Sequence, residues 1–278
     1  RAIRASERAP FAKQNLSKSD IQKNNLGPDL PFLLNQTPSV VVQSDAGNGI
    51  GYTGIRIRGT DATRINVTIN GIAYNDAESM GTFLVNLPDF ASSVSSIQIQ
   101  RGVGTSTNGA GAFGASVNLM TNDYHPSSYL SLQNTAGSFN SFKNNIVFGS
   151  GLLNNKFTID GRLSSIMSDG FIDRANSDLK SFYLSTTYWG NQSSLRLNVF
   201  TGKERTYQAW YGVPQELINT NRTFNPAGTE KADAPYENQT DNYRQTHYQL
   251  FYNKNINSQW KWNTALYLTT GKGYYEEY

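Results

Sequence analysis

Apolar and polar residues alternate with a period of two through much of the second half of the chain. In residues 157–164 the odd positions are Phe, Ile, Gly and Leu, whereas the even positions are polar or charged. Residues 195–199, 247–252 and 260–268 alternate in the same way. Successive side chains of a β-strand point to opposite faces, so these runs predict strands with one apolar and one polar face. Several predicted strands exceed the usual five or six residues, which disfavours the alternative of a soluble β-sandwich.

Seven strands are predicted after residue 127, near 128–136, 141–149, 155–168, 178–189, 193–206, 240–253 and 258–271. Short links (149–154, 190–192, 253–257) alternate with long ones (169–177, 207–239), and only the short link near 137–140 breaks this order. Short turns at one end and long loops at the other are typical of outer-membrane β-barrels. Five aromatic residues lie beside the short turns and predict one aromatic belt at the periplasmic interface: Tyr188, Trp189, Tyr252, Trp260 and Trp262.

Composition excludes several classes of function. The net charge of +3 is too small to favour nucleic acid as a partner, and the absence of cysteine removes disulfides and thiolate metal sites. The two histidines, His125 and His247, stand far apart, so no metal site is predicted. The chain contains no run of 18 apolar residues, so no transmembrane helix is predicted. Without a catalytic constellation, the chain is not expected to be an enzyme or to need a cofactor.

Residues 1–122 differ from the rest of the chain, because their predicted helices and strands are short and glycines are frequent. Residues 1–25 read as an exposed lead-in in which Ser17 and Asp20 cap a helix, and Asp29 caps a second short helix through Leu34. Leu87-Pro88-Asp89 is expected to start another, and Asn70-Gly71 predicts a tight turn. Strands are predicted at 39–43, 54–58, 64–69, 96–101 and 116–120. These elements predict a small mixed α/β domain.

A glycine-rich stretch contains a formal match to the dinucleotide-binding pattern G-x-G-x-x-G at Gly109, Gly111 and Gly114. A dinucleotide site needs a strand before the glycines, a helix after them and an acidic residue about 20 residues further on. Residues 116–120 read as a strand instead, and no acid stands at the required distance. The nucleotide interpretation is therefore rejected.

Five stretches in order resemble the plug domain of TonB-dependent receptors: 30–42 (LPFLLNQTPSVVV), 54–59 (GIRIRG), 64–71 (RINVTING), 94–104 (VSSIQIQRGVG) and 109–121 (GAGAFGASVNLMT). The chain departs from the family at Asn70-Gly71, where plugs usually carry Asp-Gly, and either dipeptide suits a tight turn. A TonB box, the segment that pairs with TonB, is not identifiable. Arg1–Pro10 resembles the segment just after that box in relatives.

The resemblance implies a mixed α/β plug domain over residues 1–122, followed over 123–278 by antiparallel transmembrane strands. Family barrels have about 22 strands, so seven strands leave a barrel that this chain does not complete, and the chain is expected to be truncated.

The function implied by the resemblance is active import of a scarce ligand across the outer membrane of a Gram-negative bacterium. The family imports iron–siderophore, haem, cobalamin, oligosaccharide or peptide. The implied partners are TonB, energised by ExbB and ExbD, outer-membrane lipids, the ligand and a surface lipoprotein in some members. The alternative is a plugged barrel without transport, acting as a surface receptor, an adhesin or part of a larger complex.

Candidate site residues follow from the same resemblance. Two glycine-containing loops of the plug, 44–52 and 74–82, are expected to bind ligand through Asn48, Tyr52, Tyr74, Asn75, Asp76 and Glu78. Three arginines are expected to pair with barrel acids and hold the plug: Arg56, Arg58 and Arg101. The long loop 207–239 offers Tyr207, Trp210 and Tyr211 for ligand capture or loop packing. His247 is expected to be a hydrogen-bonding residue on the polar strand face.

Overall fold

The computed structural model describes residues 4–104, 111–121 and 123–278, and its contacts divide the chain into two compact units. The N-terminal unit comprises Arg1–Val85 and Phe90–Asp123, and the strand unit comprises Asn86–Asp89 and Tyr124–Tyr278. The expected domain boundary, between residues 122 and 123, lies one residue from this division. The segment Asn86–Asp89 is notable because the N-terminal unit flanks it on both sides in sequence, whereas its contacts are with the strands.

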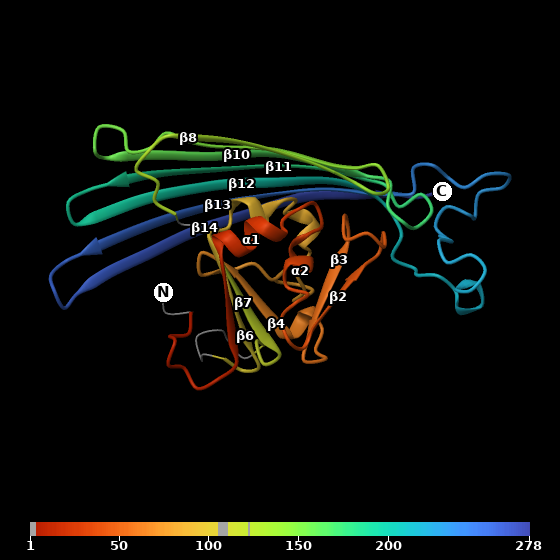
Figure 1. Ribbon diagram of the computed structural model, residues 1–278, viewed down its shortest axis with the longest axis horizontal. Coiled ribbons are helices and arrows are strands. Elements are labelled where there is room, and N and C mark those ends of the chain that lie inside the picture. Colours follow the sequence, from red (N-terminus) through yellow and green to blue (C-terminus); the bar gives the residue numbers. More distant parts are fainter. Residues whose placement is uncertain (1–3, 105–110, 122) are drawn as a thin grey trace. The chain divides into compact units, whose positions relative to one another are not determined.

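The N-terminal unit contains a five-stranded sheet in the order β1-β6-β7-β4-β5, together with the two-stranded hairpin β2-β3 (Figure 1). Its strands are β1 (Lys13–Ser17), β2 (Val40–Ser44), β3 (Thr53–Ile57), β4 (Ile65–Ile69), β5 (Ile72–Ala73), β6 (Ser96–Arg101) and β7 (Ala115–Met120). Its helices are α1 (Lys18–Asn24) and α2 (Leu30–Leu33), with 3₁₀ turns at Ala62–Arg64, Leu84–Asn86 and Phe90–Ser93. Neighbouring strands are antiparallel except β4 and β7, which are parallel. Ile57, Ile97, Ile99 and Leu119 are fully buried in the core.

Local sequence signals explain where these elements begin. Ser17 accepts a hydrogen bond from the amide of Asp20, whose carboxylate accepts one from the amide of Ser17, so the predicted capping box of α1 is confirmed. Asp29 caps α2 as predicted. Asn70 and Gly71 both have positive φ, 57° and 88°, as a two-residue hairpin turn requires between the paired strands β4 and β5.

Two expectations for this unit need correction. Residues 1–25 were expected to be an exposed lead-in, yet Lys13–Ser17 forms the edge strand β1 and pairs with β6 along five residues. The residues of β1 are mainly polar and do not alternate with apolar residues, so the sequence gives no strand signal there. The strand can still form because an edge strand pairs with only one neighbouring strand. Leu87-Pro88-Asp89 was expected to start a helix. Instead Asp89 has a left-handed backbone (φ 51°), and a 3₁₀ turn starts at Phe90.

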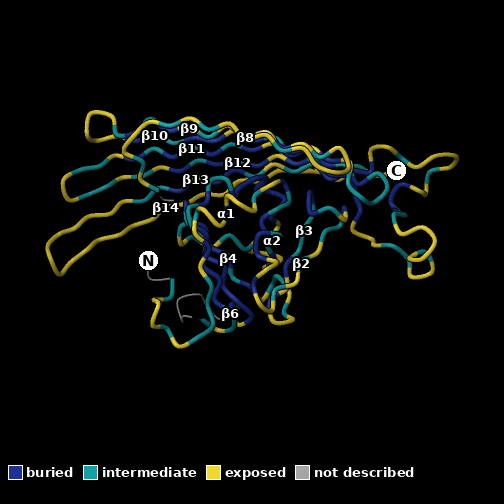
Figure 2. The backbone as a smooth tube through the Cα atoms, in the orientation of Figure 1, coloured by how far each residue is buried: buried dark blue, intermediate teal, exposed yellow. Residues whose placement is uncertain are grey.

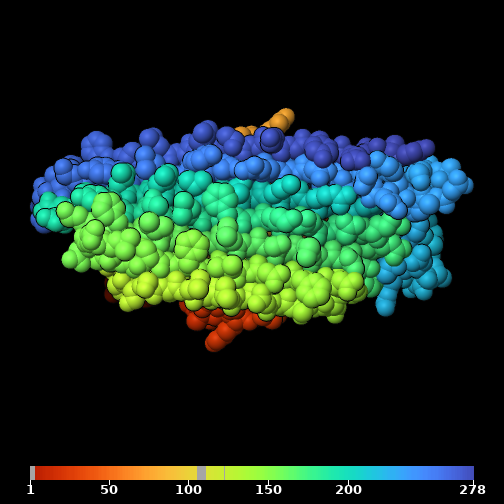
Figure 3. Space-filling view, turned by 90° about the horizontal axis from the view of Figure 1, so that it is seen from above, coloured from red at the N-terminus to blue at the C-terminus, as the bar shows by residue number. Residues whose placement is uncertain are grey.

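The strand unit is an antiparallel meander of seven strands in sequence order, from β8 to β14 (Figures 1 and 3). The strands are β8 (Tyr129–Gly137), β9 (Ser141–Gly149), β10 (Phe157–Ser168), β11 (Ser177–Trp189), β12 (Ser193–Tyr207), β13 (Thr240–Asn255) and β14 (Lys261–Glu276). The predicted number, order and approximate bounds of these strands are confirmed. The links 150–156, 190–192 and 256–260 lie at one end of the sheet, which we call the short-turn end. The links 138–140, 169–176 and 208–239 lie at the other, the long-loop end. The predicted contrast in length holds in part, because 150–156 is nearly as long as 169–176 and only 208–239 is much longer.

The two faces of this sheet differ in chemistry and in exposure. We call the face that carries Leu163, Leu197 and Leu268 the apolar face, and these three side chains are 55%, 41% and 57% exposed. The opposite, polar face carries residues such as Ser181, Asn198 and Gln249, all of which are buried. Along β10, β11 and β12 buried residues alternate with more exposed ones, whereas β14 is exposed over almost its whole length (Figure 2). A water-soluble sheet would bury the leucines, so this arrangement suits an apolar solvent on one side.

The predicted aromatic belt needs one correction. Tyr188 and Tyr252 lie on the apolar face at the short-turn end, and their neighbours in register are Leu195 and Thr264. Trp189 follows Tyr188 directly and therefore points to the polar face, where its indole NH donates to Thr158 Oγ1 at 3.3 Å. The belt on the apolar face therefore lacks Trp189.

Among the described residues, the helices are all too short or too polar to cross a membrane.

Candidate functional site

The loop between β2 and β3 is shaped by its own polar groups. Asn48 Oδ1 accepts a hydrogen bond from the amide of Ile50 at 3.3 Å, and Gly49 donates its amide to Ser44 Oγ at 2.9 Å. Gly49 has φ 83°, and a Cβ on it would lie 3.0 Å from Pro28, so a side chain is excluded there. Burial raises the pKa of Asp45 in this loop to about 6. Of the two expected ligand residues here, Asn48 thus supports the loop, and Tyr52 is half-buried.

In the loop after β5, two predicted ligand residues, Asn75 and Asp76, make hydrogen bonds that stabilise the loop. Asn75 accepts from the amide of Val67 and donates to the carbonyls of Ile65 and Met80, all within 2.9 Å. Asp76 accepts from the amide and hydroxyl of Ser79, and these bonds hold the pKa of its carboxyl below the usual value.

The side chains that this loop presents outward are different ones. Tyr74 donates its hydroxyl to the carbonyl of Phe83 at 2.7 Å. Glu78 is exposed, and so are the apolar side chains of Met80 and Phe83, at 58% and 44%. The two stabilising residues could be anticipated as turn formers, whereas Met80 and Phe83 were not predicted. The signal in the sequence was the presence of large apolar residues in and beside a loop that is otherwise polar.

The three predicted anchor arginines have neighbours within the N-terminal unit. Arg101 Nη1 donates to the carbonyl of Pro38 at 3.0 Å. The Arg58 guanidinium lies over Gly102, where a Cβ would come within 2.6 Å of it. Arg56 is exposed on β3 and contributes to lowering the pKa of Asp61, after the hydrogen bonds from Thr63. Pairing of these arginines with barrel acids stays a prediction.

The long loop between β12 and β13 is organised around Tyr207, which is 4% exposed. Its hydroxyl lies 2.6 Å from the carbonyl of Tyr236 and 3.2 Å from that of Ala227. Arg174 stacks over the Tyr207 ring at 5.7 Å and donates to the carbonyl of Asn225 at 2.5 Å. Tyr207 was predicted to serve ligand capture or loop packing, and its contacts in the structure are those of loop packing. Arg174, from the other long loop, was not predicted because the two are 33 residues apart.

The other two predicted aromatic residues remain accessible. Trp210 is 36% exposed and Tyr211 is 60% exposed, with ring centroids 6.4 Å apart. Tyr275 of β14 meets Trp210 edge-on at 5.7 Å and is itself 64% exposed. We call Trp210, Tyr211 and Tyr275 the aromatic cluster. Such a cluster offers flat apolar surface with polar edges to a ligand.

A buried ionic cluster lies on the polar face of the sheet and was not predicted. Lys143 Nζ lies 2.6 Å from Asp89 Oδ1, and Arg162 Nη1 lies 3.3 Å from Asp89 Oδ2. The three side chains are at most 2% exposed. Asn145 and Ser164 also donate to Asp89 Oδ2, at 2.9 and 2.7 Å. We call these five residues the Asp89 cluster, in which one carboxylate serves two buried cations.

The main chain of Asn86–Asp89 rests on a row of small residues. Asn145, Ser164, Ser181 and Gly202 are paired in register across β9, β10, β11 and β12. Ser181 donates its hydroxyl to the carbonyl of Pro88 at 2.6 Å. A Cβ on Gly202 would lie 2.1 Å from the carbonyl of Asn86, so only glycine permits this close approach.

His247 lies on the polar face as predicted. Its ring stacks on Phe200 at 4.8 Å, and its nitrogens lie 2.9 Å from Gln245 Oε1 and 3.0 Å from Thr269 Oγ1. The prediction of a hydrogen-bonding histidine is confirmed. Within the described ranges, no group of three His, Asp or Glu side chains could hold a metal ion. The glycine pattern falls partly outside the described residues because it includes Gly109, and β7 follows it as a strand.

Solved structures of similar fold include an outer-membrane receptor, an uptake receptor and a transporter. The ferric citrate transporter FecA is similar at 18% identity with a TM-score of 0.74, over 97% of this chain and 41% of that one. The ferric yersiniabactin uptake receptor FyuA from Yersinia pestis is similar at 12% identity with a TM-score of 0.73, over 95% and 41%. The alcaligin outer-membrane receptor FauA from Bordetella pertussis gives 13% identity and a TM-score of 0.68, over 97% and 40%. The chain thus spans about 40% of the length of these receptors.

Among curated proteins, none matches the chain. The family model of the TonB-dependent receptor plug domain matches residues 5–116. This match covers both loops and the three arginines considered above, and the strands after it continue the receptor fold. Residues 5–116 are therefore identified as a TonB-dependent receptor plug domain, and the seven antiparallel strands that follow have the fold of part of the receptors named above.

Proposed function

We propose that this chain belongs to a transporter that imports a ligand across the outer membrane with energy supplied through TonB. The plug domain match over residues 5–116 carries the proposal. The exposed leucines of the apolar face support a lipid environment, and the buried polar face supports a water-filled or plugged interior. The proteins of similar fold are named as receptors or transporters of ferric siderophores and ferric citrate. Ferric chelates are therefore the ligand class to test first.

We infer that the Asp89 cluster gives the plug chain a fixed point on the barrel wall. The chain leaves the plug domain after Val85, contributes Asn86–Asp89 to the strand unit and re-enters the plug domain at Phe90. Two buried cations need this carboxylate, because an unpaired buried charge costs several kcal/mol. The polarity is the reverse of the predicted anchor: the acid comes from the plug sequence and the cations come from barrel strands.

Uptake of a radiolabelled ferric chelate by cells that produce the complete protein tests the proposal. We expect accumulation in cells with TonB and surface binding without accumulation in cells that lack it. Accumulation that is independent of TonB would contradict the proposal. Binding without accumulation in either strain would favour the alternative, a surface receptor that does not transport.

Variants of the aromatic cluster test where the ligand binds. We expect W210A/Y211A to weaken ligand binding by about tenfold or more, since central aromatic contacts each contribute more than about 1 kcal/mol. The matched control is W260A, which removes a tryptophan at the short-turn end of the sheet. Equal affinity of W210A/Y211A and W260A would exclude the aromatic cluster as the binding site.

A further inference from the structure

Four basic residues occupy one register row on the apolar face of the sheet. Lys180 of β11 is paired with Lys203 of β12, Lys203 with Arg244 of β13, and Arg244 with Lys272 of β14. All four are exposed. We call Lys180, Lys203, Arg244 and Lys272 the cation row. The same row continues through β10, β9 and β8 as Ser165, Asn144 and Asn134, which are polar but uncharged.

This row concentrates positive charge. Adjacent strands lie about 4.8 Å apart, so each cation has a like charge directly opposite, an arrangement that destabilises a sheet. One acid is near: Asp178 lies 3.0 Å from Lys180 and is also in register with Arg205, a fifth cation. Glu276 lies two rows further toward the long loops and accepts a hydrogen bond from Tyr236. Among the described residues of the cation row and the adjacent row toward the long loops, there are thus five cations and one carboxylate.

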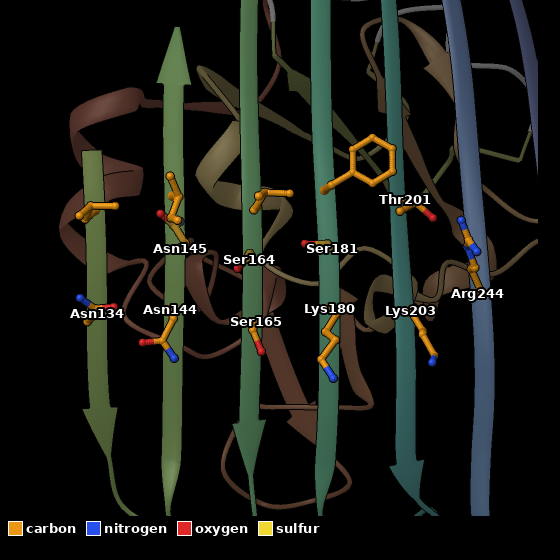
Figure 4. A pocket seen from close by; sticks show the side chains of 14 residues that line it. Asn134, Asn144, Asn145, Ser164, Ser165, Lys180, Ser181, Thr201, Lys203 and Arg244 are labelled. Carbon is orange, nitrogen blue, oxygen red and sulfur yellow. The ribbon is translucent and has the colours of Figure 1, made fainter. Parts of the chain in front are cut away.

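The next row toward the short-turn end is mainly apolar on the first four strands. Leu132, Ile146, Leu163 and Phe182 are paired across β8 to β11. The named members of both rows on β8 to β13, and therefore not Lys272, line a shallow depression of about 600 Å³ on this face. Figure 4 shows the polar row with Lys180, Lys203 and Arg244 at one level on three neighbouring strands. The depression thus offers apolar surface on one side and cations on the other.

We propose that the cation row binds the phosphate-bearing headgroup of a lipid in the outer leaflet, with the acyl chains lying against the adjacent apolar row. The orientation rests on the proposed function, in which the long loops face the cell exterior and the short turns face the periplasm. The row then lies where the apolar band ends on the exterior side. Lysines at this depth extend toward the headgroups, and a phosphate between them would relieve their mutual repulsion.

Lipid retention by the complete protein in phosphatidylcholine nanodiscs tests this site. The probe is lipid A with two phosphates, compared with the same lipid after dephosphorylation, and bound lipid is counted by mass spectrometry. The variant K180Q/K203Q/K272Q removes three members of the cation row. The control K156Q/K254Q/K261Q removes three equally exposed lysines at the short-turn end.

We expect the cation-row variant to lose affinity for the phosphorylated probe by about fivefold for each cation removed, or on the order of 100-fold in total. The control should retain the affinity of the native protein, and the dephosphorylated probe should bind all three proteins equally weakly. Equal lipid retention by the two variants would overturn the proposal. Equal retention of the phosphorylated and the dephosphorylated probe by the native protein would overturn it as well. Inorganic phosphate that displaces the lipid completely would also overturn it, since the acyl chains would then contribute nothing.

The result is independent of transport. A protein that inserts and supports TonB-dependent uptake but shows no phosphate selectivity would remove this inference alone. A protein that does not enter the outer membrane would remove the proposed function on which it rests.

Discussion

The two faces of the seven-stranded sheet carry basic residues under opposite conditions. On the polar face, Lys143 and Arg162 are almost completely buried and share the carboxylate of Asp89. On the apolar face, the cation row is exposed, and its members stand beside one another, with Asp178 beside Lys180 as the neighbouring acid. A buried cation must find its counter-charge within the protein, whereas an exposed one can find it in the surroundings. The comparison predicts that substitutions of charged residues change the free energy of unfolding strongly on the polar face and weakly on the apolar face.

The largest effect is expected from D89N. This change keeps the shape of the side chain but leaves two buried cations without a counter-charge, and removal of one partner of a buried pair costs about 3–5 kcal/mol. The matched control is D178N, which removes the exposed partner of Lys180 and should cost less than about 1 kcal/mol. Urea unfolding of the complete protein in detergent measures both. Equal costs for the two variants would break the comparison between the faces.

The second effect tests close packing on the polar face without changing charge. G202V places a side chain where the carbonyl of Asn86 would be 2.1 Å from its Cβ. Overpacking of this kind costs about 1–3 kcal/mol, and it should expose Asn86–Asp89 to limited proteolysis. G111A is the control, because a Cβ there meets nothing within 4 Å. Protection of Asn86–Asp89 in G202V would show that the segment does not depend on this contact.

The third prediction compares adjacent residues on opposite faces. W189F removes the hydrogen bond to Thr158 and weakens the contact with Arg196, whose guanidinium lies 5.9 Å from the indole ring. We expect a loss of about 1 kcal/mol. Y188F, one residue earlier, keeps its ring against Phe157 on the apolar face and should change stability by less than about 0.5 kcal/mol. Thermal unfolding of the two variants in one detergent gives the difference.

The smallest effect is expected from K203Q in lipid-free detergent. The side chain is exposed and lies between two other cations, so its removal should change the free energy of unfolding by less than about 0.5 kcal/mol. The sign should be stabilising, because repulsion within the row decreases. A destabilisation as large as that of D89N would mean that the cation row is structural.

The long strands could be predicted because period-two alternation persists over many residues, and one wrong register would move every apolar residue to the other face. The Asn70-Gly71 turn could be predicted because few residues accept positive φ at both positions. Position beside a turn does not determine the face of a side chain, and alternation from Tyr188 places Trp189 on the polar face. β1 was missed because its sequence, KQNLS, has no apolar periodicity.

The candidate site was less accessible to sequence reasoning. Asn75 and Asp76 could be identified as polar loop residues, but whether such a side chain braces its loop or meets a ligand depends on which backbone groups come near. The Asp89 cluster joins residues as far as 75 positions apart, and Pro88-Asp89 has the local appearance of a helix start. Pairs this distant leave no periodic pattern in a single sequence.

The pairing of β1 with β6 has a mechanical consequence. β1 is an edge strand held by one neighbour along five residues, and ahead of it Ala5 is tied to the Gln98 side chain through both its amide and its carbonyl. A force applied at the N-terminal end and directed away from the sheet would open these links one after another, so the yield force at each step is low. β1 is therefore the first part of this sheet that a force on the N-terminal end would detach.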